Sequence, residues 1–358
     1  MALTTVRPQG MGFNTGRRNL IINGAMQVAQ RGTSAVTINS GSATYRLDRF
    51  YASGASSAGV YTVEQSTDAP ANFKNSLKVT VTTADSSIGS TANYRVQQSL
   101  EGQNISHLNY GSSDAQTITL SFYVKSSLTG TFGGRLSNSA LDRSYPYTYT
   151  ISSANTWERK TVTIAGDTSG TWLDTNGIGI ALVWSIGAGS SRLGTAGAWA
   201  GTRYDGASGQ TNIIATNSST WFITGVQLEV GSNASDFEHR SFGEELGLCQ
   251  RYYEKSYRYS DAPGTVDIDS AVTFLANRNP GNPHYGLRFR TEKRADPTIV
   301  SYNPNDGTSG EMRNLDASTD DGATIDRIGT NGCTIRSDVG STSLGNFMAF
   351  HYTSESEL

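Results

Sequence analysis

Apolar residues alternate with small polar residues over many short stretches of this chain. In the segment 117–124, four apolar side chains share one parity and would lie on one face of an extended backbone: Ile118, Leu120, Phe122 and Val124. The same period of two recurs in the stretches 77–81, 162–164, 178–186 and 222–230. Such alternation is typical of a strand that turns one face to a core and the other to water. Gly225 interrupts the last stretch and predicts a β-bulge there.

Turn-forming dipeptides separate these stretches. Asn-Gly or Asp-Gly pairs begin at residues 23, 176, 205, 306, 321 and 331, and these residue types tolerate the positive φ angles of tight turns. Charged residues make up only 16% of the chain, against about 25% in typical soluble domains, and Ser, Thr, Asn and Gly supply much of the polarity. This composition favours strands over helices. The chain is therefore predicted to be an all-β protein of antiparallel, jelly-roll-like sandwiches.

One short helix is expected to interrupt the strands. The residues Ser241-Phe242-Gly243-Glu244 have the spacing of a capping box and predict a helix over about 244–249. This helix joins the two sandwiches and divides the 358 residues into an extended N-terminal arm at 1–16, a large β-sandwich at 17–240 and a smaller one at 241–358. The arm is too short and too polar to fold alone, so we expect it to dock on another component.

The net charge and the apolar stretches argue against two kinds of partner. The net charge is −3 without a basic stripe, whereas nucleic-acid binding requires a positive face that neutralises phosphates. The longest apolar stretch, residues 178–186, is far shorter than the roughly 20 residues of a membrane span. The first residues also lack the cationic start and apolar run of a secretory signal. We therefore expect no nucleic-acid partner and no membrane insertion.

Histidine and cysteine are too few and too scattered to predict a metal site. No two of the four histidines have the spacing of metal ligands, so no metal or other cofactor is expected. His239 is interpreted as a packing and hydrogen-bonding residue. Cys249 and Cys333 are expected to be free buried thiols, with a disulfide as the alternative, because a protein assembled in a cytosol keeps its cysteines reduced.

Several stretches resemble the landmarks of a module that is widespread in phage tail fibres. The segment NLIINGAMQVAQRGTS at 19–34 resembles the opening of this module. YRLDRF at 45–50 resembles its next landmark, with Phe50 where Trp is frequent in the family. The end of the module is similar to VQLEVG at 226–231 and DFEHR at 236–240.

The resemblance continues into the last third of the chain. GEELGLCQRYY at 243–253 is similar to the family's junction, while FRTEKRADPT at 289–298 and ESEL at 355–358 resemble a second tail module. The resemblance implies a carbohydrate-binding-like jelly roll, a place in the virion tail after assembly in the host cytoplasm, and usually a homotrimer. Residues 1–16 would then attach to another tail or virion protein. The family motifs carry over no catalytic residue.

Aromatic side chains supply the candidates for ligand binding, because sugar rings stack their apolar faces on aromatic rings. One group lies on a single face of an extended segment: Tyr145, Tyr147 and Tyr149. A second group lies in a Gly-rich loop: Trp199, Arg203, Tyr204 and Asp205. Each group also has a structural interpretation, the tyrosines as a stripe in a core or a subunit interface and the loop as a packed segment.

Two charged clusters are given structural interpretations. The segment 251–259 interleaves basic and aromatic residues, and we expect a solvated strand face at a subunit interface rather than a site for single-stranded nucleic acid. The mixed-charge cluster in the second module is expected to form a surface salt-bridge face, with pairing across a subunit contact as the alternative: Glu292, Lys293, Arg294 and Asp296.

An enzymatic role is not expected, although acidic residues occur in pairs. A glycosidase needs two carboxylates across a groove, and candidate pairs are Glu244/Glu245, Asp267/Asp269 and Asp320/Asp321. A chain with 31 acidic residues offers such pairs by chance, however, and no repeat typical of a β-helical depolymerase is found. We expect a phage tail-fibre or tail-tip subunit that contacts host surface polysaccharide. The alternatives are a purely structural virion subunit and, after it, a polysaccharide depolymerase.

Overall fold

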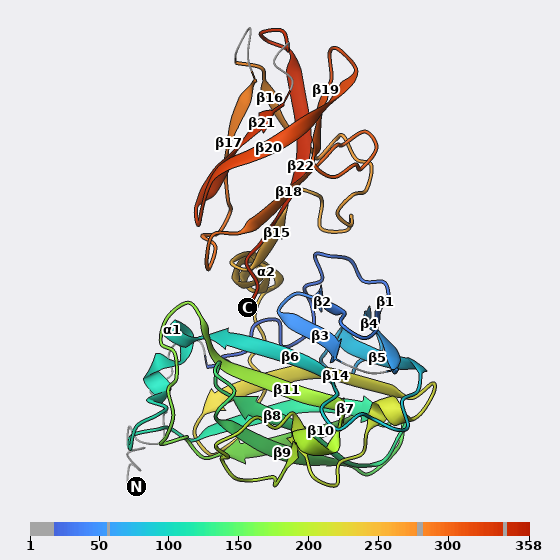
Figure 1. Ribbon diagram of the computed structural model, residues 1–358, viewed down its shortest axis with the longest axis vertical. Coiled ribbons are helices and arrows are strands. Elements are labelled where there is room, and N and C mark those ends of the chain that lie inside the picture. Colours follow the sequence, from blue (N-terminus) through green and yellow to red (C-terminus); the bar gives the residue numbers. More distant parts are fainter. Residues whose placement is uncertain (1–17, 56–57, 278–281, 339–341) are drawn as a thin grey trace, which may run out of the picture.

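The computed structural model describes residues 18–55, 58–277, 282–338 and 342–358 (Figure 1). The predicted N-terminal arm at 1–16 therefore lies outside the described residues. Nearly all the elements are strands, and they form two bodies, one above the other in the view, with a short helix between them (Figure 1). The expected all-β fold is confirmed.

The N-terminal body is a sandwich of two six-stranded antiparallel sheets. Sheet A contains, in spatial order, β1 (Val36–Ile38), β4 (Val60–Ser66), β5 (Ser76–Thr83), β14 (Thr220–Val230), β7 (Ile118–Ser126) and β10 (Glu158–Ile164). Sheet B contains β2 (Ala43–Leu47), β3 (Phe50–Ala55), β6 (Asn93–Glu101), β11 (Ile178–Ala188), β8 (Gly130–Ser137) and β9 (Ser144–Ile151). In sheet A, β14 lies between β5 and β7 and pairs with both, so strands that are far apart in sequence are neighbours in the sheet.

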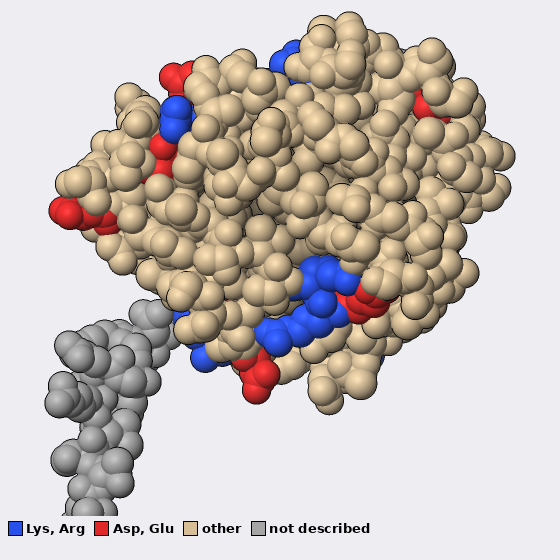
Figure 2. All heavy atoms as spheres, turned by 90° about the horizontal axis from the view of Figure 1, so that it is seen from below, with Lys and Arg blue, Asp and Glu red and all other residues tan. Residues whose placement is uncertain are grey.

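The core of the sandwich is formed by the alternate apolar side chains that the sequence places on one face of each strand. In β7 the side chains of Ile118, Leu120, Phe122 and Val124 are all buried, and they face apolar side chains of sheet B such as Trp184. Each fully buried side chain of this size contributes about 1.5–3 kcal/mol relative to an exposed one. Seen from below, the surface is mostly uncharged, with Lys and Arg gathered in a few places (Figure 2).

Gly225 lies inside β14, where the register with β7 shifts between Thr224 and Gln227. Its φ angle is +60°, a value that residues with a Cβ atom rarely adopt. A Cβ atom at this position would also lie 2.7 Å from the ring of Phe73. The predicted β-bulge is confirmed, and both its backbone angle and its neighbours require glycine.

Helix α2 (Phe242–Gln250) follows the sandwich. The side chain of Ser241 accepts the backbone N–H of Glu244 at 3.3 Å, so the predicted capping serine is confirmed. Shorter helical turns are α1 (Gly102–Ile105), η2 (Ser106–Leu108), η3 (Ser190–Arg192) and η4 (Ile213–Ala215). Within the described ranges, no helix combines the length and the apolar character that crossing a membrane requires.

The C-terminal body is one eight-stranded sheet that curls around its own apolar core. Its long strand β22 (Phe347–Glu355) lies between β16 (Val272–Leu275) and β19 (Glu311–Asn314) in one half, and between β15 (Tyr253–Lys255) and β18 (Thr298–Tyr302) in the other. The sheet continues from β19 through β20 (Thr319–Gly329), β21 (Gly332–Ser337) and β17 (His284–Arg288). Cys333 in β21 and Cys249 in α2 are free and buried, as expected.

The two bodies are joined by buried cation–aromatic and ion-pair contacts. The guanidinium of Arg49 lies 3.4 Å from the centroid of the Tyr252 ring and pairs with the carboxylate of Glu357. Arg31 lies 3.6 Å from the centroid of the Tyr253 ring and also pairs with Glu357, at 3.3 Å. Contacts of this kind are worth up to about 2 kcal/mol each when water is excluded. They hold the sandwich and the C-terminal sheet together.

This junction brings the sequence landmarks into one place. Segments 19–34 and 45–50 of the sandwich meet 243–253 and the end of the chain at 355–358. In Figure 1 the C-terminal end of the chain indeed returns to α2. The landmark residues thus have a shared structural task, which is to fix the two bodies against each other.

Two sequence predictions about charged clusters are wrong. Within 251–259, the side chains of Tyr252, Tyr253 and Tyr257 are buried, so this segment is not a solvated strand face. Lys293 is fully buried and pairs at 2.6 Å with Glu254, which is also fully buried, so the second cluster is not simply a surface salt-bridge face. In both cases the contacts that cover the residues come from distant segments, and sequence spacing does not report them.

Candidate functional site

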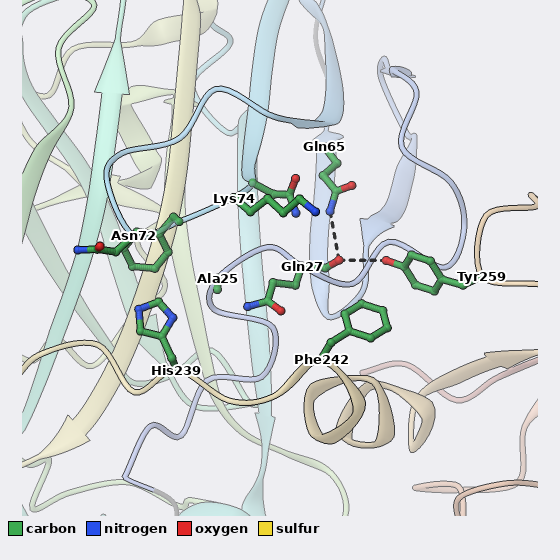
Figure 3. A pocket seen from close by; sticks show the side chains of 10 residues that line it. Ala25, Gln27, Gln65, Asn72, Lys74, His239, Phe242 and Tyr259 are labelled. Atoms are coloured by element: carbon green, nitrogen blue, oxygen red, sulfur yellow. Dashed lines mark hydrogen bonds between the residues drawn. The ribbon is translucent and has the colours of Figure 1, made fainter.

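A pocket of about 550 Å³ opens where the sandwich meets α2 and the C-terminal body (Figure 3). Ten residues line it: Ala25, Gln27, Gln65, Asn72, Phe73, Lys74, Asn75, His239, Phe242 and Tyr259. They come from the loop before β1, the end of β4, the β4–β5 loop, the linker before α2, α2 itself and the loop after β15. The volume lies in the range of small-ligand pockets.

The loop before β1 is held in place by the side chain of Asn23. Its Oδ1 accepts the backbone N–H of Val28 at 2.9 Å, and its Nδ2 donates to the carbonyls of Val28 and Asp48 at 2.8 and 2.9 Å. Gly24 permits a close approach, since a Cβ atom there would lie 2.1 Å from the carbonyl oxygen of Val226. This Asn-Gly pair therefore shapes a buried loop rather than a hairpin, and it presents Gln27 to the pocket.

Two exposed aromatic rings form one wall. Phe242 and Tyr259 meet edge to face, with centroids 5.1 Å apart, and their side chains are 43% and 38% exposed. The Tyr259 hydroxyl donates to the carbonyl of Gln27 at 3.0 Å and accepts the backbone N–H of Ala29 at 2.8 Å. Burial of the hydroxyl end raises the pKa of Tyr259 to about 12. The ring is thus fixed by its buried hydroxyl while its face stays open to solvent.

A second aromatic group forms the opposite side. The ring of Phe73 lies about 5 Å from those of Tyr123, Phe237 and His239, at 5.3, 5.0 and 5.2 Å between centroids. An adjoining hollow of about 430 Å³ shares Asn72, Phe73 and His239 with the pocket. The two hollows together make an elongated site lined by aromatic rings.

Several polar side chains that line this space have no protein partner in the described part of the chain. Among the described residues, no hydrogen bond or ion pair engages the side chains of Gln27, Asn72, Lys74 and Asn75. Gln65 uses its Nε2 to bind the carbonyl of Met26 at 2.6 Å. Figure 3 shows Gln27 and Lys74 projecting between His239 on one side and Phe242 and Tyr259 on the other. The pocket therefore offers free hydrogen-bond donors and acceptors beside open aromatic faces.

The lining carries little charge. Lys74 has the only permanently charged side chain among the ten lining residues, and none of them is acidic. No group of three or more His, Cys, Asp or Glu side chains suited to a metal ion occurs in the described parts of the chain. Such a lining can bind a neutral, hydroxyl-rich molecule by stacking and hydrogen bonds.

The three tyrosines of the predicted stripe are buried in the sandwich. Tyr145, Tyr147 and Tyr149 lie on the inner face of β9 and are 7%, 1% and 5% exposed. The Tyr147 hydroxyl donates to the carbonyl of Val183 at 2.8 Å, and the Tyr149 hydroxyl accepts from Trp221 at 3.1 Å. Their burial supports the structural interpretation of the stripe, because the face that they share is turned to the core.

The predicted loop group lies away from the junction pocket. Trp199 packs edge to face against the rings of Tyr145 and Trp172, and its indole N–H donates to the carbonyl of Ala165 at 2.8 Å. Asp205 is buried and is surrounded by arginines that include Arg203.

Tyr204 completes the loop group. Its ring packs on Gly194, where a Cβ atom would lie 2.3 Å from the ring. Arg203 and Asp205 thus form an ion pair, Trp199 packs on Tyr145 of β9, and none of the four loop residues lines the junction pocket.

Sequence reasoning missed the residues of the junction pocket. Phe242 stood inside the capping box, Gln27 inside a landmark segment and Tyr259 at the end of the basic–aromatic segment, so each had a structural interpretation. The one usable signal was Phe242, an aromatic residue in the first turn of a short helix, because few residues of such a helix can pack against its side chain.

Comparison with known proteins gives structural similarities only. No protein-family model matches the chain, and no curated protein does. A putative sugar binding protein from Bacteroides thetaiotaomicron VPI-5482 is similar over 60% of this chain and 100% of its own length, with 13% identity and a TM-score of 0.37.

Two further solved structures are similar at the same level. One is the enzymatically active domain of tailspike protein 4 from bacteriophage CBA120. The similarity covers 60% of this chain and 21% of that domain, with 12% identity and a TM-score of 0.32. A family 11 carbohydrate-binding module from Clostridium thermocellum is covered over 99% by 58% of this chain, with 10% identity and a TM-score of 0.29. This chain therefore spans about a fifth of the tailspike domain.

Proposed function

We propose that this protein is a polysaccharide-binding subunit of a phage tail, and that the junction pocket holds the sugar. One observation carries the proposal: free amide and ammonium groups converge on a pocket with two exposed aromatic rings. A sugar ring has apolar C–H faces that stack on such rings, while its hydroxyls require both donors and acceptors. Gln27 and Asn75 supply both, and Lys74 supplies a donor.

The tail assignment is supported by the sequence landmarks. Segments that resemble the tail-fibre module converge at the domain junction and line or support the pocket. A place in the virion tail, attachment through residues 1–16 and assembly as a homotrimer in the host cytoplasm belong to the same proposal. In a trimer, three weak sites would act together, because binding of the first raises the effective concentration of the others.

A binding role, as opposed to a catalytic one, is supported by the contacts of the paired acidic residues, because Glu245 and Asp320 already form ion pairs with arginines. Glu245 is buried, accepts the backbone N–H of Asn23 at 2.5 Å and pairs with Arg240 at 3.3 Å. Asp320 pairs with Arg313 at 2.8 Å. A glycosidase requires two carboxylates that face each other across the substrate, and the junction pocket is lined by none.

Affinity electrophoresis of the full protein in gels containing host capsular and lipopolysaccharide glycans tests the proposal. Replacing Phe242 with alanine removes one stacking face without opening the core. We expect about tenfold weaker binding, or ~1.4 kcal/mol, to the polysaccharide that retards the unchanged protein. Phe347→Ala is the matched control, because Phe347 is also a half-exposed phenylalanine but lies outside the pocket.

The outcomes separate the two roles. Retardation that Phe242→Ala weakens and Phe347→Ala does not would support the junction pocket. If a correctly folded protein is retarded by none of the host glycans, the protein is instead a structural virion subunit. A release of shortened glycan during the assay would point to a depolymerase.

A further inference from the structure

A loop crosses the outer face of sheet B and places one carboxylate among four arginines. The loop contains η3 (Ser190–Arg192), β12 (Leu193–Gly194) and β13 (Gly206–Ala207), and the two short strands pair in parallel. Asp205 precedes β13, and its backbone N–H donates to the carbonyl of Arg192 at 2.7 Å. The side chain of Asp205 thereby faces the polar side of strands β6 and β8.

The four guanidinium groups come from the sheet and from the loop. Arg135 on β8 and Arg203 in the loop each lie 3.0 Å from a carboxylate oxygen of Asp205. Arg192 lies at 3.8 Å and Arg95 on β6 at 3.9 Å. Among the described residues, none of the four arginines forms an ion pair with a second carboxylate. One negative charge thus faces four positive charges.

The excess positive charge opens toward solvent. The side chains of Asp205 and Arg135 are 1% and 2% exposed, whereas those of Arg95, Arg192 and Arg203 are 19%, 27% and 25% exposed. The pKa of Arg135 is lowered to about 10, because burial and the positive charges of Arg95 and Arg203 together outweigh the attraction of Asp205. The Nε of Arg95 is buried without a hydrogen-bond partner in the described structure.

The cluster borders a second groove. Arg95 lines a groove of about 690 Å³ together with Tyr45, Tyr51 and Gln97 of the same sheet face, and the side of the groove that the C-terminal body forms carries three carboxylates, those of Asp296, Glu355 and Glu357. The rings of Tyr45 and Tyr51 lie 5.1 Å apart, and the Arg95 guanidinium lies 5.8 Å from the centroid of Tyr51.

We propose that Arg95, Arg192 and Arg203 form an oxyanion site that binds the carboxylate or phosphate groups of an acidic polysaccharide. Guanidinium groups suit both oxyanions, because their N–H groups form paired, charge-assisted hydrogen bonds with two oxygen atoms. Asp205 and the buried Arg135 orient the three outer arginines. The site shares no residue with the junction pocket, so it is a separate function from the neutral-sugar site proposed above.

Affinity electrophoresis of the full chain distinguishes the two sources of oxyanion. The gels contain polygalacturonate, fully methyl-esterified polygalacturonate as the uncharged control, or polyphosphate. We expect retardation by at least one acidic polymer, none by the ester, and a loss of retardation as salt is raised. Retardation by polygalacturonate alone assigns the carboxylate, and retardation by polyphosphate alone assigns the phosphate.

Arginine-to-glutamine variants connect the binding to this cluster. Arg203→Gln and Arg192→Gln are each expected to weaken binding about tenfold, because each loses a charge-assisted contact. Arg288→Gln is the control, since Arg288 is exposed and lies outside the cluster and the groove. Arg192 lies 3.8 Å from Asp205 and contributes little to its anchoring, so this variant keeps the test valid if Arg203→Gln fails to fold. The proposal is overturned if neither polymer retards the protein, or if Arg288→Gln weakens binding as much as the cluster variants.

Discussion

Replacing Lys293 with methionine removes one half of an ion pair that is shielded from water. The Nζ of Lys293 lies 2.6 Å from the Oε2 of Glu254, and both side chains are 0% exposed. Glu254 also accepts the hydroxyl of Tyr352 at 2.7 Å and the backbone N–H of Arg290 at 3.1 Å. Methionine is similar to lysine in length, so the variant removes the charge without opening a large cavity.

The expected loss of stability follows from the charge that remains. Removing one partner of a buried ion pair costs on the order of 3–5 kcal/mol, because the other charge stays buried and uncompensated. The two remaining hydrogen bonds of Glu254 favour the lower end, about 3 kcal/mol. Burial lowers the pKa of Lys293, and its attraction to Glu254 opposes this only in part. The pair as a whole therefore adds little net stability, and the double variant Glu254→Gln/Lys293→Met should recover most of the loss.

Urea denaturation followed by two signals measures this effect. All five tryptophans lie between residues 157 and 221, so tryptophan fluorescence reports the sandwich, while far-ultraviolet circular dichroism reports both bodies. The circular dichroism transition should move to lower urea in the variant. A loss below about 1 kcal/mol would refute the reasoning.

Three further predictions concern the core and the thiols. Tyr147→Phe loses a hydrogen bond of 2.8 Å to a backbone carbonyl of β11 and should unfold with about 1 kcal/mol less free energy in urea, with unchanged polysaccharide binding in affinity gels. Weaker binding would contradict its place in the core. Gly225→Ala should cost at least about 1 kcal/mol, because φ is +60° and an aromatic ring is too close; Gly243→Ala, in open space within α2, should be neutral or stabilising. Burial raises the pKa of Cys249 and raises that of Cys333 to about 12, so neither should react with a thiol reagent at pH 8 until denaturant is added. Reaction of the folded protein would show that a thiol is accessible.

The local features of the fold could be predicted because each depends on neighbours in sequence. The period of two marks strands such as β7 and β14, since alternate side chains of an extended backbone point to opposite faces. Gly225 marks a bulge, because its backbone angle excludes most other residues. Ser241 marks the start of α2, because its side chain satisfies an N–H group three residues away.

Only the tertiary structure decided which faces are buried and which residues form sites. The period of two places Tyr145, Tyr147 and Tyr149 on one face but does not say that this face meets sheet A. The Tyr259 hydroxyl contacts the carbonyl of Gln27, 232 residues away in sequence, and the junction pocket depends on such contacts. Sequence spacing determines which side chains share a strand face or a helix turn, whereas burial and pocket geometry come from segments that meet only after the chain has folded.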